Sequence, residues 1–126
     1  MLDELDKLIS GFPGVEADWT GKQWVAYWLC NHRNLWVAIF TDRTTHLLLR
    51  WRLQKSFQLP PDLAGQLGVR EEDVVIGAPD HPKGMKGVCV WIGKNFNTDP
   101  EALRRFLEAL RRFLKEAHGS ALNVWR

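Results

Sequence analysis

The sequence has few cysteines, a small net charge and no long apolar run. Its two cysteines, Cys30 and Cys89, lie in or beside apolar strand-like segments, which suits reduced thiols better than a disulfide framework. The longest apolar run, residues 35–40, falls far short of the roughly 20 residues of a membrane span. The first residues are acidic where a signal peptide needs positive charge. We therefore expect a soluble, cytoplasmic protein that does not enter a membrane.

Patterns that carry catalysis or hold a metal are also lacking. Cys30 and His32 are spaced like one pair of zinc ligands, but the sequence has no second pair, and the other histidines show no zinc-ligand spacing. The Gly/Pro/Lys loop at 77–87 lacks the spacing of a phosphate-binding P-loop. Neither Ser56 nor Ser120 stands in the context of a nucleophile, and no acidic pair has nuclease spacing. The sequence therefore predicts a protein that is not an enzyme and has no metal and no cofactor.

The length and composition indicate one globular domain over residues 1–126. The chain is 45% hydrophobic and 25% charged, without low-complexity tracts. Apolar residues recur at helical spacing from Leu5 to Phe12 and predict a short N-terminal helix that Pro13 and Gly14 end.

A long C-terminal helix is predicted from about residue 99 to 118. Thr98 with Glu101 fits a capping box, and Gly119 fits a C-terminal stop. The motif Ala-Leu-Arg-Arg-Phe-Leu occurs at 102–107 and again at 109–114, which gives one broad apolar stripe. We expect this stripe to pack on a sheet, with helix-mediated dimerisation as the alternative. The tail, 120–126, has strand spacing and is expected to dock on the sheet.

Charges on the outer side of this helix fit a solvated face. The pairs Glu101–Arg105 and Glu108–Arg112 have the favourable i,i+4 order.

The middle of the chain predicts strands. Residues 15–22 read as a polar loop, and residues 23–29, 35–41 and 45–53 are rich in Trp, Val, Ile and Leu and predict a three-stranded meander. Shorter strands are expected at 73–76 and 87–92. The predicted fold class is α+β: an antiparallel sheet of four to five strands, a long C-terminal helix packed on one face and a short N-terminal helix.

Pairing these strands on paper separates two faces. Trp28 is expected to face Trp36, and a three-residue second turn then places Val37 opposite Leu49 and Trp36 opposite Arg50. One face becomes an aliphatic core, whereas the other carries a row of Trp and Arg with alanines between them.

The Trp and Arg face suggests a function. Aromatic rings on an accessible sheet stack on unpaired bases, while cations meet phosphates. We therefore predict binding of single-stranded or distorted DNA or RNA. The expected contact residues are Trp24, Trp28, Trp36, His46, Arg50, Arg52, Lys83 and Lys86.

Other interpretations remain open at this point. The N-terminal helix or the 54–86 segment could cover the tryptophans and make them a second core layer. The protein could be an interaction or assembly subunit, or a homodimer, that uses the Leu/Phe helix or the Trp face. A small-ligand pocket around Ala26 and Ala38 is a third possibility.

The order of elements from Val15 to Ala117 resembles a small α+β domain of unknown function, of the predicted-transport-protein type, found attached to restriction-type nucleases. The matching strands contain Trp24-Val-Ala-Tyr-Trp28 and Leu47-Leu-Leu-Arg-Trp-Arg-Leu53, with a Gly-flanked strand from Gly87 to Gly93 before the last helix. The 54–86 segment departs from that compact pattern. The resemblance implies the fold and a nucleic-acid context, and it provides no catalytic residues.

Overall fold

The computed structural model describes residues 2–29, 34–41, 46–54, 58–78, 85–93 and 99–125. Side chains are described for these ranges except at 34, 53, 54, 78, 85, 86 and 120–125. The elements in chain order are α1 (Leu2–Ser10), β1 (Glu16–Asp18), β2 (Trp24–Leu29), β3 (Asn34–Phe40), β4 (His46–Gln54), α2 (Leu63–Leu67), η1 (Glu71–Asp73), β5 (Val74–Ala78), β6 (Met85–Gly93) and α3 (Pro100–Trp125).

The strands form one antiparallel sheet in the order β1-β2-β3-β4-β6-β5. This confirms the predicted α+β class, with six strands where four to five were expected. The additional strand, β1, lies in the segment expected to be a polar loop. Its residues Glu16 and Ala17 are exposed and Asp18 is partly exposed, so the segment carries no apolar alternation that would predict a strand.

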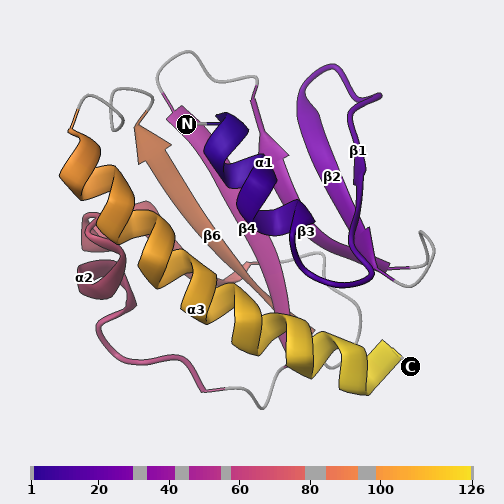
Figure 1. The fold of residues 1–126 in the computed structure, drawn as a ribbon. Coiled ribbons are helices and arrows are strands. Elements are labelled where there is room, and N and C mark those ends of the chain that lie inside the picture. The colour runs from indigo at the N-terminus through magenta and orange to yellow at the C-terminus, as the bar shows by residue number, and fades with distance from the viewer. Residues whose placement is uncertain are drawn as a thin grey trace.

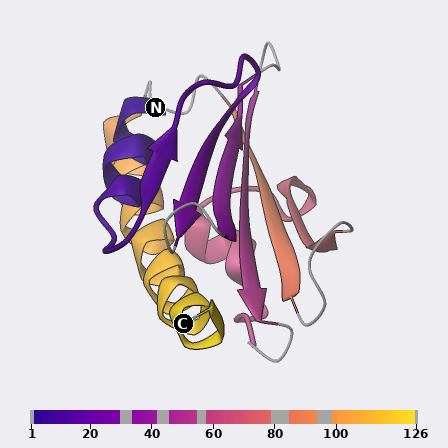
Figure 2. The same cartoon turned by 90° about the vertical axis from the view of Figure 1, so that its right-hand side faces the viewer.

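The helices lie on one side of the sheet (Figure 1). Seen edge-on, α1 and α3 stand together on one side and the strands on the other (Figure 2). The side chains between these layers form the core, in which Trp36, Trp51, Tyr27 and Phe106 are the largest fully buried residues. We call this side of the sheet the helix side.

Alternation along the strands produces the core. In β4, Leu47, Leu49 and Trp51 are buried, while the residues between them are partly exposed. The central strand β6 repeats this pattern with buried Val88, Val90 and Ile92. One face of an antiparallel sheet therefore packs on the helices and the other does not.

Two polar contacts fix α1 and the turn that follows it. Tyr27 Oη donates a hydrogen bond to Asp6 Oδ1 at 2.9 Å, and burial followed by this bond raises the pKa of Tyr27. His118 Nε2 lies 2.7 Å from the carbonyl oxygen of Pro13, which joins the end of α1 to α3. Leu5 and Ile9 of α1 are fully buried.

The apolar stripe of α3 packs on the sheet as predicted. Phe106, Leu110, Phe113, Leu114 and Ala117 are buried, so this stripe is not a free dimerisation surface.

The ends of α3 differ from the prediction. Asp99 Oδ1 accepts hydrogen bonds from the backbone N–H groups of Glu101 and Ala102, so Asp99 caps the helix, and Thr98 lies outside the described residues. The helix continues through Gly119 to Trp125, and the expected stop and strand-like tail are wrong. Glycine costs a helix interior only about 1 kcal/mol and stops it only when it turns left-handed.

The predicted register is correct for part of the sheet. Trp24 pairs with Phe40, and Ala26 pairs with Ala38, as expected. Val37 lies opposite Trp51, however, and not opposite Leu49. The β3–β4 register therefore differs by two residues from the expected one, and the predicted turn at residues 42–44 lies outside the described residues. A shift of two preserves the face of every side chain, so the division into two faces is unaffected.

None of the helices within the described ranges is both long enough and apolar enough to span a membrane.

The burial of α3 gives a stability prediction. Leu110 is fully buried and Leu107 only partly, so Leu110→Ala should lower the free energy of unfolding by about 2–5 kcal/mol because it leaves a cavity. Leu107→Ala should cost clearly less. Urea unfolding of both variants measures the difference, and a neutral Leu110→Ala would contradict the assignment of the stripe to the core.

Candidate functional site

The sheet face opposite the helices is the candidate site, and we call it the open face. The buried side chains of α1, α2 and α3 all belong to the core on the helix side, and Figure 2 shows α1 and α3 on that side of the strands. The register aligns its side chains in rows across the strands. Trp24 pairs with Phe40, Phe40 with Leu48, and Leu48 with Trp91. All four residues of this apolar row are partly exposed.

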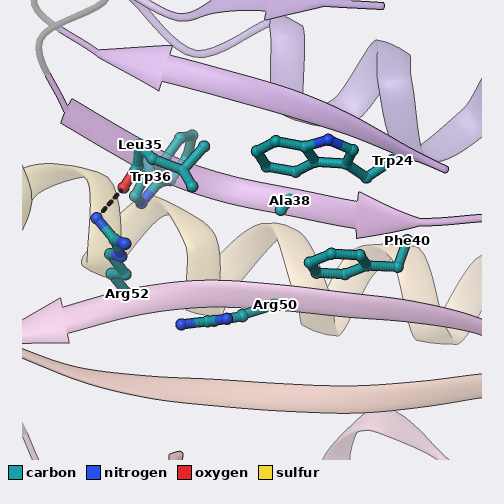
Figure 3. A pocket seen from close by; sticks show the side chains of 7 residues that line it. All are labelled: Trp24, Leu35, Trp36, Ala38, Phe40, Arg50 and Arg52. Carbon is teal, nitrogen blue, oxygen red and sulfur yellow. Dashed lines mark hydrogen bonds between the residues drawn. The ribbon is translucent and has the colours of Figure 1, made fainter. Parts of the chain in front are cut away.

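The next row is made of small residues with one cation. Ala26 pairs with Ala38, Ala38 with Arg50, and Arg50 with Cys89. The two alanines are too short to fill the space beside the aromatic row. A hollow of ≈ 260 Å³ results, and Figure 3 shows the side chains around it. Its lining consists of Trp24, Leu35, Trp36, Ala38, Phe40, Arg50 and Arg52.

The aromatic wall of the hollow is preorganised. The rings of Trp24 and Phe40 are stacked, with centroids 5.8 Å apart and an angle of 12° between their planes (Figure 3). Gly21 lies against the five-membered ring of the Trp24 indole. A Cβ at Gly21 would lie 2.8 Å from Cδ1 of the indole, so a larger residue there would displace the ring. Trp24 is therefore held in place before any ligand arrives.

The opposite wall carries two cations close to each other. Arg52 Nη1 donates a hydrogen bond to the carbonyl oxygen of Leu35 at 3.1 Å, which fixes its guanidinium group (Figure 3). Burial lowers the pKa of Arg52, and the charge of Arg50 lowers it further. An anion between the two guanidinium groups would relieve this repulsion. In the part of the chain that the structure describes, no carboxylate pairs with Arg52.

Charge on the open face is divided between its two sides. Glu16 and Asp18 of the edge strand β1 pair with Trp28 and Ala26, which places both carboxylates beyond the aromatic residues of β2. The arginines lie on β4, which β2 and β3 separate from β1. An anionic ligand would therefore place its charge over β4 and its uncharged part toward β2.

The structure brings most of the predicted contact residues to the open face. Trp24, Trp28, Arg50 and Arg52 are partly exposed there. His46 is also partly exposed and meets the ring of Trp91 edge-on, with centroids 6.4 Å apart. Lys83 lies outside the described residues. The backbone of Lys86 pairs with Leu53 in the sheet, but its side chain is not described.

The predicted position of Trp36 is wrong. Tyr27 pairs with Val37 and Trp28 pairs with Leu35, so Trp36 is the extra residue of a β-bulge in β3. The bulge turns its side chain to the helix side, where its ring meets Phe12 and His118. Trp36 is only 1% exposed, so it offers a ligand almost no surface although it borders the hollow. The expected pairs Trp28–Trp36 and Trp36–Arg50 do not form.

Two aromatic residues of the open face, Phe40 and Trp91, were not among the predicted contacts. Alternation would have identified Trp91, because it stands between Val90 and Ile92, which face the core. The sequence did predict that Phe40 pairs with Trp24. Because paired residues share a face of the sheet, this pairing implied that Phe40 lies on the open face.

No group of His, Cys, Asp and Glu suited to a metal ion occurs among the described residues. Comparisons with protein-family models, with curated proteins and with solved structures find no match to this chain. The resemblance to the nuclease-attached α+β domain therefore stays a prediction.

Cys89 provides a chemical test of the open face. It is partly exposed beside Arg50, whereas the sequence suggested a core thiol, and Cys30 lies outside the described residues. Burial raises the pKa of the Cys89 thiol, and the charge of Arg50 offsets this only in part. In a Cys30→Ser background, maleimide should label native Cys89 more slowly than the urea-unfolded chain, with a rate that rises as the pH is raised above neutral. Equal rates in both states would contradict this environment.

Proposed function

We propose that this protein binds single-stranded nucleic acid through the open face and is not itself a catalyst. The observation that carries the proposal is the hollow over Ala38, which has stacked aromatic rings on one wall and two neighbouring guanidinium groups on the other. A nucleotide needs both surfaces at once, an aromatic one for the base and a cationic one for the phosphate.

The partly exposed apolar row supports an elongated ligand over a small one. At ≈ 260 Å³ the hollow is smaller than the roughly 300–1,000 Å³ of pockets that enclose a small molecule. The row from Trp24 to Trp91 continues across four strands, which is on the order of 14 Å at the usual strand spacing. A strand of nucleotides can place one base in the hollow and others along this row.

The charge pattern supports local rather than global attraction. The net charge is only +2, so long-range steering toward a polyanion is weak. Arg50 and Arg52 instead provide a short-range phosphate contact beside the aromatic residues. We infer binding without strong sequence preference, because stacking accepts every base.

Fluorescence anisotropy with a labelled oligothymidylate tests the aromatic part of the proposal. Trp24→Ala should weaken binding by about 1–3 kcal/mol because it removes one stacking ring. Trp19→Ala is the matched control, because Trp19 is 50% exposed and does not line the hollow. Urea unfolding of each variant verifies that the fold persists. Equal affinity of the wild type and Trp24→Ala would contradict the proposal.

Salt dependence tests the cationic part. Arg50→Ala should reduce the slope of log affinity against log salt concentration by roughly 0.7, the value for one phosphate contact on a single strand. Arg105→Ala on α3, remote from the open face, should leave the slope unchanged. Affinity that does not grow from a mononucleotide to an octanucleotide would favour the small-ligand alternative. Absence of oligonucleotide binding would contradict the proposal and favour the alternative that the protein is an interaction or assembly subunit.

A further inference from the structure

A second concave surface lies on the helix side, between α1 and α3. These two helices lie side by side over the sheet (Figure 1). A groove of ≈ 830 Å³ runs between them, and Leu8, Phe12 and Leu107 form its apolar part. All three pack against the core yet remain partly exposed. We call this surface the α1–α3 groove.

The rim of the groove is strongly basic. Among the described residues, Lys7, Arg111, Arg112 and Lys115 line it together with one carboxylate, Glu4. All four cationic residues are exposed. An apolar strip bordered by four cations and one anion complements an acidic partner that also presents apolar side chains.

The three cations that α3 contributes to the groove are not neutralised by carboxylates of that helix. In the first half of α3, Arg104 pairs with both Glu101 and Glu108, at 2.8 Å for Glu108. The predicted pairs Glu101–Arg105 and Glu108–Arg112 do not form. Within the described ranges, neither Arg111, Arg112 nor Lys115 pairs with a carboxylate. On α3, the arginine that is paired with carboxylates therefore lies outside the groove, and the cations without a carboxylate partner line the groove.

We infer that the α1–α3 groove docks an acidic amphipathic helix of a protein partner. The apolar part of the groove fits anchors at i, i+3 or i+4 of such a helix, and the basic rim fits its acidic flanks. The nine residues of α1 extend about 14 Å at the usual helical rise, which matches two to three turns of a partner helix. The inference does not depend on nucleic-acid binding, because the groove and the open face lie on opposite sides of the sheet.

Calorimetric titration with a synthetic peptide tests this inference. The probe is a 14-residue peptide with Leu and Phe at i, i+3, i+4 and i+7 and Glu on its remaining positions. A scrambled peptide of the same composition lacks the apolar stripe. The amphipathic peptide should bind measurably and more tightly than the scrambled one, and its affinity should fall as salt is added.

Matched variants localise the binding. The double variant R111E/K115E should weaken the amphipathic peptide at least tenfold, whereas R105E, on the same helix but outside the groove, should leave its affinity unchanged. Leu8→Gln should also weaken it, because the apolar contact is lost while the charge stays the same. Thermal unfolding verifies that each variant is folded.

Four results would overturn the inference. Three of them come from the peptide titrations: no binding of the amphipathic peptide at millimolar concentration, equal affinity of the scrambled peptide, and an R111E/K115E variant that binds as the wild type does. Displacement of the peptide by oligothymidylate would also overturn it, because the groove would then be a phosphate-binding surface. Failure of the oligonucleotide to bind the open face has no bearing on these outcomes.

Discussion

The alternation of side chains along the central strands is the constraint on which both surfaces depend. In β4 and β6 every second residue is buried against the helices packed on one side, and β2 and β3 alternate in the same sense, although Ala26 and Ala38 on their other face are buried as well. Each residue between them must then lie on the open face. Apolar residues there, such as Trp24, Leu48 and Trp91, gain nothing from the core and remain partly exposed. Their presence on a face that packs on no described helix distinguishes this sheet from one whose outer face is merely polar.

The bulge at Trp36 is the exception to this alternation, and it has consequences on both sides of the sheet. On the helix side, the extra residue fills the space between Phe12 and His118. On the open face, the bulge places Leu35 opposite Trp28, and the Leu35 carbonyl accepts the hydrogen bond that fixes Arg52. The same local distortion therefore contributes to the core and to the cationic wall of the candidate site.

Much of the fold and part of the site could be predicted from the sequence. The period of two in β4 and the period of the apolar stripe in α3 gave the correct faces, because burial acts on every residue of those segments. The bulge could not be predicted, since residues 34–40 carry no glycine or other local signal at Trp36 and its position is decided by contacts with α1 and α3. The continuation of α3 past Gly119 is likewise decided by packing, because Ala117 and His118 are buried just before it. Alternation in β6 is enough to predict that Trp91 lies on the open face. The hollow over Ala38 also requires the β3–β4 register, which differs from the expected one by two residues.

The two surfaces give the domain two independent sides. The open face combines aromatic rings with guanidinium groups, whereas the α1–α3 groove combines apolar side chains with cations that have no carboxylate partner among the described residues. A single layer of strands and its core separate them. Under the two proposals, an acidic partner helix on the helix side and single-stranded nucleic acid on the open face would not exclude each other.

The tryptophans provide the sharpest test of nucleic-acid binding at the open face, because they are divided between the two sides of the sheet. The side chains of Trp24, Trp28 and Trp91 are partly exposed on the open face, while those of Trp36 and Trp51 are fully buried in the core. Nitrogen-edited NMR spectra of the indole N–H groups should be recorded with and without a short oligothymidylate. If nucleic acid binds the open face, the signals of Trp24 and Trp91 should shift strongly and those of Trp36 and Trp51 should change little. Unchanged Trp24 and Trp91 signals, or shifts confined to the buried pair, would contradict it.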